Sequence, residues 1–178
     1  LVVSGHSKGA LTAIRQIAEM KVDVPMLAMT HCDASKLAKQ HGKKSEYALC
    51  AAQWHKSLSY KDKFFGNGMK YDKEFKAQFG YAPPYQAAES SAALLVWKDA
   101  FERANSLDKD KVRDALSKTE MQTFYGNIKF SPAGQNIAKP MVLFQVRCEG
   151  DKCENKVVAP TKWAAAELVH PIPKWSDR

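Results

Sequence analysis

The sequence lacks any apolar run long enough to cross a membrane. A transmembrane helix needs roughly 18 to 20 consecutive apolar residues, and here charged or polar residues interrupt every apolar stretch well before that length. Internal repeats and low-complexity tracts are also absent. These absences exclude a helical membrane-spanning protein and a repeat array.

The chain also lacks an initiator methionine and a signal-peptide pattern. Leu1 opens a short apolar run that continues through Val2 and Val3, with no charged region before it. We therefore expect the 178 residues to be a fragment of a longer protein. This length suits one medium domain or pieces of two.

Acidic residues are fewer than basic ones, 19 against 27, which leaves a formal net charge of +8. Such an excess occurs in proteins that bind nucleic acid or acidic surfaces. Here the lysines are spread along the whole chain and alternate with acids, as in residues 70–76 and 108–114. We interpret the charge as a solvated surface and expect no nucleic-acid partner.

Cysteine is scarce, with four residues in the chain. Cys148 and Cys153 flank a polar turn between two β-rich runs, which predicts a disulfide at a hairpin tip and an oxidising compartment such as the periplasm. Their spacing, with no second Cys/His pair after them, excludes a zinc pattern, and no metal is expected. Cys32 and Cys50 either pair or remain buried thiols.

The first third of the chain predicts alternating strands and helices. Apolar runs predict strands at residues 1–3, 24–29 and 47–52, and helical periodicity predicts a helix from Lys8 to Met20. A strand, helix, strand order implies parallel strands with a right-handed crossover. Asp33 is a plausible cap for a short helix that stops at Gly42.

The rest of the chain predicts helices and then strands. Residues 56–66 are polar and irregular; helices follow at 68–79, at 85–104 and after Asp108. We expect Met69, Asp72 or Phe75, and Phe79 on the periodic face of the first, and packing on two sides of the second. Strands are predicted at 126–130, 141–147 and 156–160, followed by an extended, mobile tail. The fold class is α/β.

One motif favours an enzyme. Gly5-His6-Ser7-Lys8-Gly9 fits the nucleophile-elbow pattern, with Ser7 as nucleophile and His170 as candidate base. Only four residues precede Gly5, too few for the upstream part of an oxyanion hole, and His170 is followed at once by proline. A serine hydrolase of the α/β-hydrolase type is therefore the alternative, and the preferred interpretation has no catalytic residue.

A longer pattern covers nearly the whole chain. Residues 1–29 form a strand, a glycine-containing loop, a helix with Ile14-Arg15-Gln16 and a strand opened by Pro25. Further segments follow in a fixed order, at 71–80, 83–85, 104–108, 112–116, 126–130, 134–136, 157–160 and 171–175. Together they resemble the C-terminal portion of periplasmic substrate-binding proteins of branched-chain amino-acid ABC transporters, the leucine/isoleucine/valine-binding family.

The resemblance implies a type 1 periplasmic-binding-protein fold, in which two doubly wound lobes are joined by a crossover hinge and only the C-terminal half is present. Residues 1–52 and 138–178 would form the distal lobe, and 53–137 would return to the N-terminal lobe. It implies a monomeric periplasmic protein without a cofactor. Such a protein is not an enzyme; it captures a small solute by hinge closure and delivers it to a membrane permease.

Candidate ligand contacts lie in the loops after the first two strands, because open α/β sheets bind ligands beyond the carboxyl ends of their strands. The first loop offers His6 and Ser7, although Ser7 equally suits a helix cap; the second offers Thr30 and His31. The amino-acid binders of this family place a carboxylate at about the position of Thr30, where it pairs with the ammonium group of the ligand. Threonine at this position therefore argues against an amino acid as the ligand. We favour Asp33 as a helix cap.

Two aromatic residues complete the candidate site. Trp54, between Gln53 and His55 at the predicted crossover, either stacks on a flat ligand or packs at the hinge. Tyr85, before the long helix, either reaches the cleft or joins the core. These features predict a small carboxylated solute, either an amino acid or, more favoured, an aromatic or organic acid.

Overall fold

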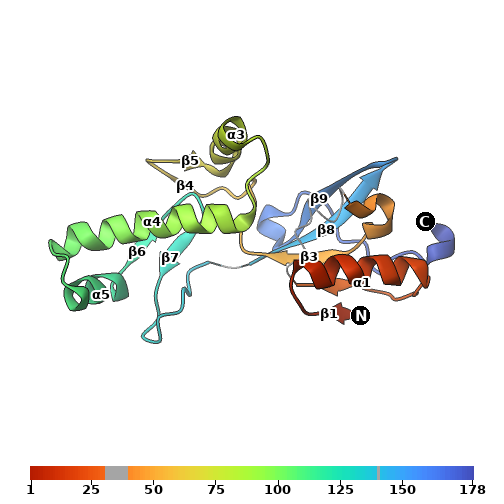
Figure 1. Ribbon diagram of the computed structural model, residues 1–178, viewed down its shortest axis with the longest axis horizontal. Helices are drawn as coiled ribbons and strands as arrows, with labels where there is room; N and C mark the ends of the chain where they lie inside the picture. The colour runs from red at the N-terminus through yellow and green to blue at the C-terminus, as the bar shows by residue number, and fades with distance from the viewer. Residues whose placement is uncertain (31–39, 140) are drawn as a thin grey trace. The chain divides into compact units, whose positions relative to one another are not determined.

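A computed structural model describes residues 1–30, 40–139 and 141–178 (Figure 1). The chain divides into two compact units, unit 1 with residues 1–52 and 141–178, and unit 2 with residues 53–140. The boundary predicted at residue 138 lies at Met141 in this division. His31, Cys32 and Asp33, with most of the short helix predicted to stop at Gly42, lie outside the described residues, and Gln40 and His41 at its end are helical. Among the described helices, none has the length and apolarity needed to cross a membrane.

Unit 1 is built on a five-stranded sheet with the order β1-β2-β3-β8-β9. Its strands are β1 (Val2–Val3), β2 (Ala28–Met29), β3 (Leu49–Ala52), β8 (Val142–Glu149) and β9 (Lys152–Ala159). The first three run parallel, whereas β8 runs antiparallel to both β3 and β9. The predicted parallel arrangement at the start of the chain is therefore confirmed.

Helix α1 (Ser7–Glu19) connects β1 to β2 and buries Ala10, Ile14 and Ile17. This spacing of three and four residues places the apolar side chains on one face of the helix. Strand β3 begins two residues later than predicted because Tyr47 has a φ of 66°, a left-handed conformation that does not continue a strand. The short 3-10 helix η1 (Gly42–Ser45) lies just before it.

The β8–β9 hairpin contains the predicted disulfide. Cys148 and Cys153 are direct partners in the hairpin register and are joined by a disulfide bond. Cys50 is disulfide-bonded too, so it is not a buried thiol. The other predicted member of that pair, Cys32, lies outside the described residues.

The C-terminal tail is held against unit 1, so the prediction of a mobile tail is wrong. Ile172 is buried, and its backbone N–H donates to the Pro25 carbonyl at 3.0 Å. The indole N–H of Trp175 donates to the Val22 carbonyl at 3.0 Å, and its backbone N–H donates to the carboxylate of Asp23. These hydrogen bonds to the segment before β2 fix a stretch that has little regular structure of its own.

Unit 2 contains three helices at the positions that the sequence predicts: α3 (Gly68–Phe79), α4 (Tyr85–Ala104) and α5 (Lys109–Ser117). The side chain of Asn67 accepts a hydrogen bond from the Lys70 N–H, and Asp108 accepts from two N–H groups of α5. Gly80 ends α3 with a φ of 77°. The helix boundaries are thus set by local capping chemistry.

Of the residues predicted on the periodic face of α3, Asp72 is buried, whereas the residues at the two ends of that face are not. Met69 and Phe79 are more than half exposed, whereas Gly68, Tyr71 and Asp72 are buried. An ion-pair cluster decides which face of α3 is buried. Asp72 forms ion pairs with Lys56 and Lys76, which compensate the cost of burying its carboxylate and orient the helix.

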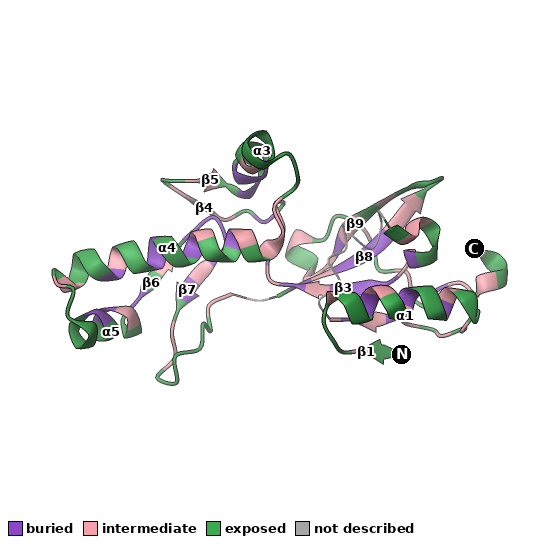
Figure 2. Ribbon diagram, in the orientation of Figure 1, coloured by how far each residue is buried: buried purple, intermediate pink, exposed green. Residues whose placement is uncertain are grey.

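Helix α4 buries one stripe only, Ala88, Ala92, Leu95, Val96 and Ala100 (Figure 2). Leu94 is 69% exposed, so packing on two sides is not observed in unit 2. At the end of α4, Arg103 donates to the Ala115 carbonyl at 2.7 Å and to the Thr119 hydroxyl at 2.9 Å, which joins α4 to α5.

Two short antiparallel strand pairs complete unit 2. Strand β4 (Lys61–Asp62) pairs with β5 (Gly66–Asn67), and β6 (Glu120–Gln122) pairs with β7 (Asn127–Lys129). Strands of two or three residues are too short for periodicity to reveal them, so the segment at 56–66 was predicted to be irregular. The strand predicted at 126–130 is confirmed in its central three residues.

Candidate functional site

The carboxyl ends of β1 and β2 are joined through Thr30. Its hydroxyl accepts a hydrogen bond from the Gly5 N–H at 2.9 Å and donates one to the Gly5 carbonyl at 3.1 Å. The Thr30 N–H also donates to the Val3 carbonyl at 3.1 Å. Thr30 therefore shapes the loop at residues 4–6, and its hydroxyl proton is already committed to that loop.

His6 and Ser7 follow directly at the start of α1. His6 is exposed and occupies the cap position with extended backbone angles, and its side chain makes no capping hydrogen bond. Ser7 is the first helical residue, so the interpretation of Ser7 as the helix cap is wrong. The start of a helix presents backbone N–H groups and a partial positive charge, a favourable environment for an anionic ligand group.

The backbone around Ser7 does not form a nucleophile elbow. That motif holds its serine in a sharp, strained turn. Among the described residues, positive φ angles at non-glycine positions occur at Lys21, Tyr47 and Asn105, and Ser7 lies in an ordinary helical turn. The described residues also contain no group of three or more His, Cys, Asp or Glu side chains able to hold a metal ion.

Trp54 lies inside the aromatic core of unit 2. It is 4% exposed, and its ring makes edge contacts with Tyr71 and Phe124 at centroid distances of 5.8 and 6.0 Å. Its indole N–H donates to the Phe124 carbonyl at 3.4 Å. In this structure the ring has no exposed face for a ligand, so the packing interpretation replaces stacking.

Tyr85 remains a candidate contact because it is the first residue of α4 and only half-buried. It lies in unit 2, whereas His6, Ser7 and Thr30 all lie in unit 1. The structure therefore brings together the three unit 1 residues at one sheet edge and leaves Tyr85 in a separate unit. His31 lies outside the described residues.

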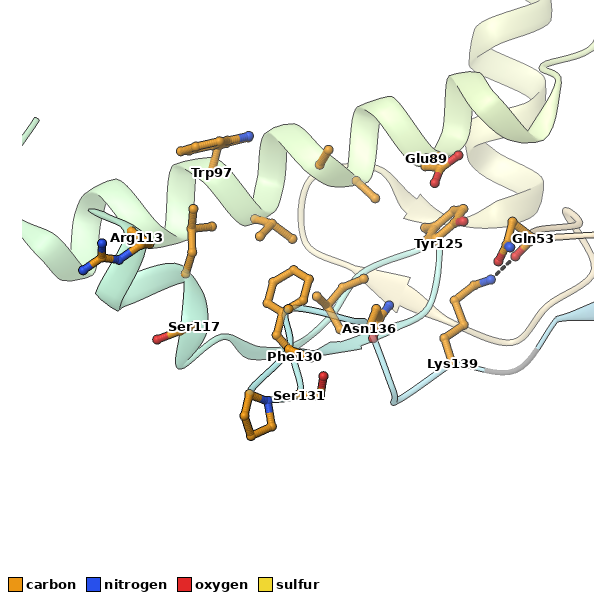
Figure 3. A pocket seen from close by; sticks show the side chains of 18 residues that line it. Gln53, Glu89, Trp97, Arg113, Ser117, Tyr125, Phe130, Ser131, Asn136 and Lys139 are labelled. Atoms are coloured by element: carbon orange, nitrogen blue, oxygen red, sulfur yellow. Dashed lines mark hydrogen bonds between the residues drawn. The ribbon is translucent and has the colours of Figure 1, made fainter. Parts of the chain in front are cut away.

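Unit 2 contains a groove of about 940 Å³ that the sequence did not predict (Figure 3). Its walls come from α4, α5, β7 and the turn after β7, and they are mostly apolar, including Ala92, Val96, Trp97, Leu116, Ile128 and Phe130. None of the predicted ligand contacts lines it.

One end of the groove is polar. The Lys139 ammonium lies 4.2 Å from the ring centroid of Tyr125 and donates a hydrogen bond to the Gln53 carbonyl. Burial lowers the pKa of Lys139 to about 8, against an opposing effect of Glu89. Burial, followed by the charge of Glu89, raises the pKa of the Tyr125 hydroxyl, which stays neutral.

Sequence reasoning missed this polar cluster. Lys139 is one of 27 lysine and arginine residues, and no local pattern separates it from the others. Gly126 offers a partial signal, because its φ of 154° favours glycine and an added Cβ would collide with the Lys139 side chain. That collision is visible only in the folded chain.

The described geometry agrees with comparisons against known proteins. Superposition on a leucine-binding protein LivK from Thermotoga maritima gives a TM-score of 0.73 at 22% identity, covering 90% of this chain and 45% of that one. A putative branched-chain amino-acid ABC transporter protein from Silicibacter pomeroyi gives 0.70 at 15% identity, covering 98% and 47%. The substrate-binding protein LivJ from Streptococcus pneumoniae, solved with isoleucine, gives 0.69 at 15% identity, covering 89% and 44%.

This chain thus spans about half the length of the solved structures that it matches, as expected for one portion of the type 1 fold. The fold class predicted from the sequence is confirmed, and no comparison supports the hydrolase. A family model described as periplasmic binding protein matches residues 1–152. The chain belongs to the periplasmic binding protein family.

Proposed function

We propose that this chain is part of an extracytoplasmic solute-binding protein of an ABC importer, which captures a small carboxylated solute without chemical conversion. The family match over residues 1–152 carries the proposal. The matched LivK and LivJ proteins are named for leucine binding and for a branched-chain amino-acid transporter, and LivJ holds isoleucine. These names support an amino acid or a related organic acid as the solute.

The loop at residues 4–7 supplies the chemistry for a carboxylate. Helix α1 begins at Ser7, so its first N–H groups face the same loop that Thr30 holds in place. An anion at this position gains from the partial positive charge at the start of the helix. His6 and Ser7 are the proposed contacts from unit 1, and Thr30 positions the loop that bears them.

Thr30 also affects whether the solute carries an ammonium group. A threonine whose hydroxyl is bonded to Gly5 supplies no negative charge for an ammonium group. This favours an aromatic or organic acid over an amino acid. Tyr85 from unit 2 and His31 complete the proposed contacts.

Capture follows from ligand contacts in both units. A solute that contacts both favours the closed arrangement, because it gains contacts there that it lacks in the open one. The proposed protein is a periplasmic monomer, and its partners are the solute and the membrane permease that receives it. No cofactor takes part.

The test is a thermal-shift screen with L-leucine, L-phenylalanine, phenylacetate, benzoate and succinate. One class should raise the melting temperature in a saturable way, since a ligand at 100 times its Kd stabilises the folded state by about 2.7 kcal/mol. Ser7→Ala and His6→Ala should weaken the shift. Gln16→Ala, an exposed change more than two turns further along α1, is the matched control and should leave the shift intact.

No shift with any compound would contradict the proposal. Covalent labelling of Ser7 by a fluorophosphonate would instead favour the hydrolase. Solute recovered unchanged after incubation, with a saturable shift, supports capture without chemistry.

A further inference from the structure

The chain crosses between the two units twice, after Ala52 and before Met141. On the unit 1 side, Ala52 of β3 is the register partner of Val142 of β8. On the unit 2 side, Lys139 donates a hydrogen bond to the Gln53 carbonyl (Figure 3). The two connecting segments are therefore held together by strand pairing in unit 1 and by a side-chain hydrogen bond in unit 2.

The surroundings of Lys139 hold its side chain in this position. Its ammonium lies over the ring of Tyr125, which is 6% exposed, at 4.2 Å from the centroid. A cation over an aromatic face is attracted by the ring quadrupole. Gly126 leaves room for the stem of the lysine, because a Cβ there would occupy the same space. A lysine fitted among a ring, a glycine and a carbonyl is more constrained than a surface lysine.

We propose that Lys139 is a positioning residue that clamps the two interunit connections together and so limits the range of arrangements open to the units. The proposal rests on the proposed function, in which the units close on a solute. The clamp acts through backbone, since its acceptor is the main-chain carbonyl of Gln53 and not the amide side chain.

The expected change in amide hydrogen-exchange rates follows from the free energy of one hydrogen bond. A net hydrogen bond contributes about 1 kcal/mol, which corresponds to a roughly fivefold change in an equilibrium constant. Loss of the Lys139 bond should therefore raise the exchange rate of backbone amides near both crossings, Gln53–Trp54 and Met141–Val142, by about fivefold. Amides in the middle of α4 and α5 should keep their protection.

The experiment combines hydrogen exchange with pulsed spin-label distances on the full chain without solute. Labels at Met20 in unit 1 and Leu107 in unit 2, both more than 70% exposed, report the spread of interunit distances. Lys139→Met retains the length of the stem and removes the donor, so the distance distribution should broaden. Lys139→Arg retains a positive charge and N–H donors, so it should keep the distance distribution narrower than Lys139→Met does.

Two matched variants separate the clamp from general effects. Gln53→Ala leaves the carbonyl in place and should behave as the unmodified protein. Lys73→Met removes one positive charge from an exposed position of α3 and should also change nothing. Broadening in either of them would overturn the proposal, because it would show that side-chain or charge loss alone is sufficient.

Equal exchange rates and equal distributions in Lys139→Met and the unmodified protein would also overturn it. If Lys139→Met does not fold, Lys139→Leu, which also removes the donor and keeps an apolar stem, takes its place in the comparison. No measurement here uses a solute, so a negative thermal-shift screen would contradict the proposed function without touching this result.

Discussion

The hydroxyl of Thr30 exchanges hydrogen bonds with both backbone groups of Gly5, at 2.9 Å from the N–H and 3.1 Å to the carbonyl. The two residues lie 25 positions apart and follow neighbouring parallel strands. This one side chain therefore sets the loop between β1 and α1. Thr30 is predicted to contact a ligand, and the structure shows that it shapes the loop that carries His6 and Ser7.

Thr30→Val should destabilise unit 1 by about 1 to 2 kcal/mol, because it removes both bonds and leaves two backbone groups of Gly5 without that partner. Chemical denaturation measures the loss. Thr30→Ser retains the hydroxyl and should cost clearly less. Equal stability of the valine variant and the unmodified protein would contradict a positioning role.

Trp54→Ala should cost about 3 to 5 kcal/mol, because it removes a buried ring from contact with Tyr71 and Phe124. Trp54→Phe should recover part of this loss, since it refills most of the volume. Thermal melts followed by circular dichroism provide the measurement. If the alanine variant keeps its stability and loses solute binding instead, the stacking interpretation would regain support.

The paired variant Cys148→Ser with Cys153→Ser should lower the free energy of unfolding by about 2 kcal/mol, since the bond restricts the unfolded chain over a short loop. Denaturant titration without reductant is the measurement, because reductant would also affect Cys50. Ser176→Ala, an exposed serine of unit 1, serves as a neutral reference. An unchanged midpoint in the paired variant would indicate that the hairpin alone suffices.

His55 should make unit 2 sensitive to acid. Burial, followed by the charge of Lys56, lowers the pKa of His55 to about 4, against an opposing effect of Asp72. In the unfolded chain His55 binds a proton below about pH 6.5, whereas in the folded chain it binds one only below about pH 4. Stability should therefore fall as pH drops from 6.5 to 4. His55→Gln should flatten this slope, and an unchanged slope would contradict the assignment.

Lys139 should also make the free energy of unfolding rise with pH, here in the alkaline range. Its pKa is lowered from 10.5 to about 8, so between these values the unfolded chain holds a proton that the folded chain has released. Stability should rise with pH through this window. Glu89 opposes the shift from α4, while the Tyr125 hydroxyl, its pKa raised, stays neutral.

Denaturation midpoints at pH 7.5, 8.5 and 9.5 measure this contribution. Lys139→Met should lose the rise that the unmodified protein shows. Lys73→Met retains Lys139 and should keep the rise. The same pH profile in both variants would remove Lys139 as its origin.

Much of the local structure follows from the sequence. The bounds of α3 and α4 and the cap of α5 agree with prediction because Asn67, Gly80 and Asp108 act on neighbouring residues only. The order of short motifs along the chain indicated the family for a related reason, since each motif occupies a fixed place in one fold. Cys148 and Cys153 are likewise partners across a single turn.

The sequence by itself therefore determined the helices, the hairpin disulfide, the α/β class and the family. Tertiary structure decided the roles of individual side chains: Thr30 as a loop support, Trp54 as core, and Lys139 as the partner of Gln53. Lys139 and Gln53 lie 86 residues apart, and only folding brings them together. A side chain's role depends on what burial places around it, and neighbours along the chain do not reveal those distant partners.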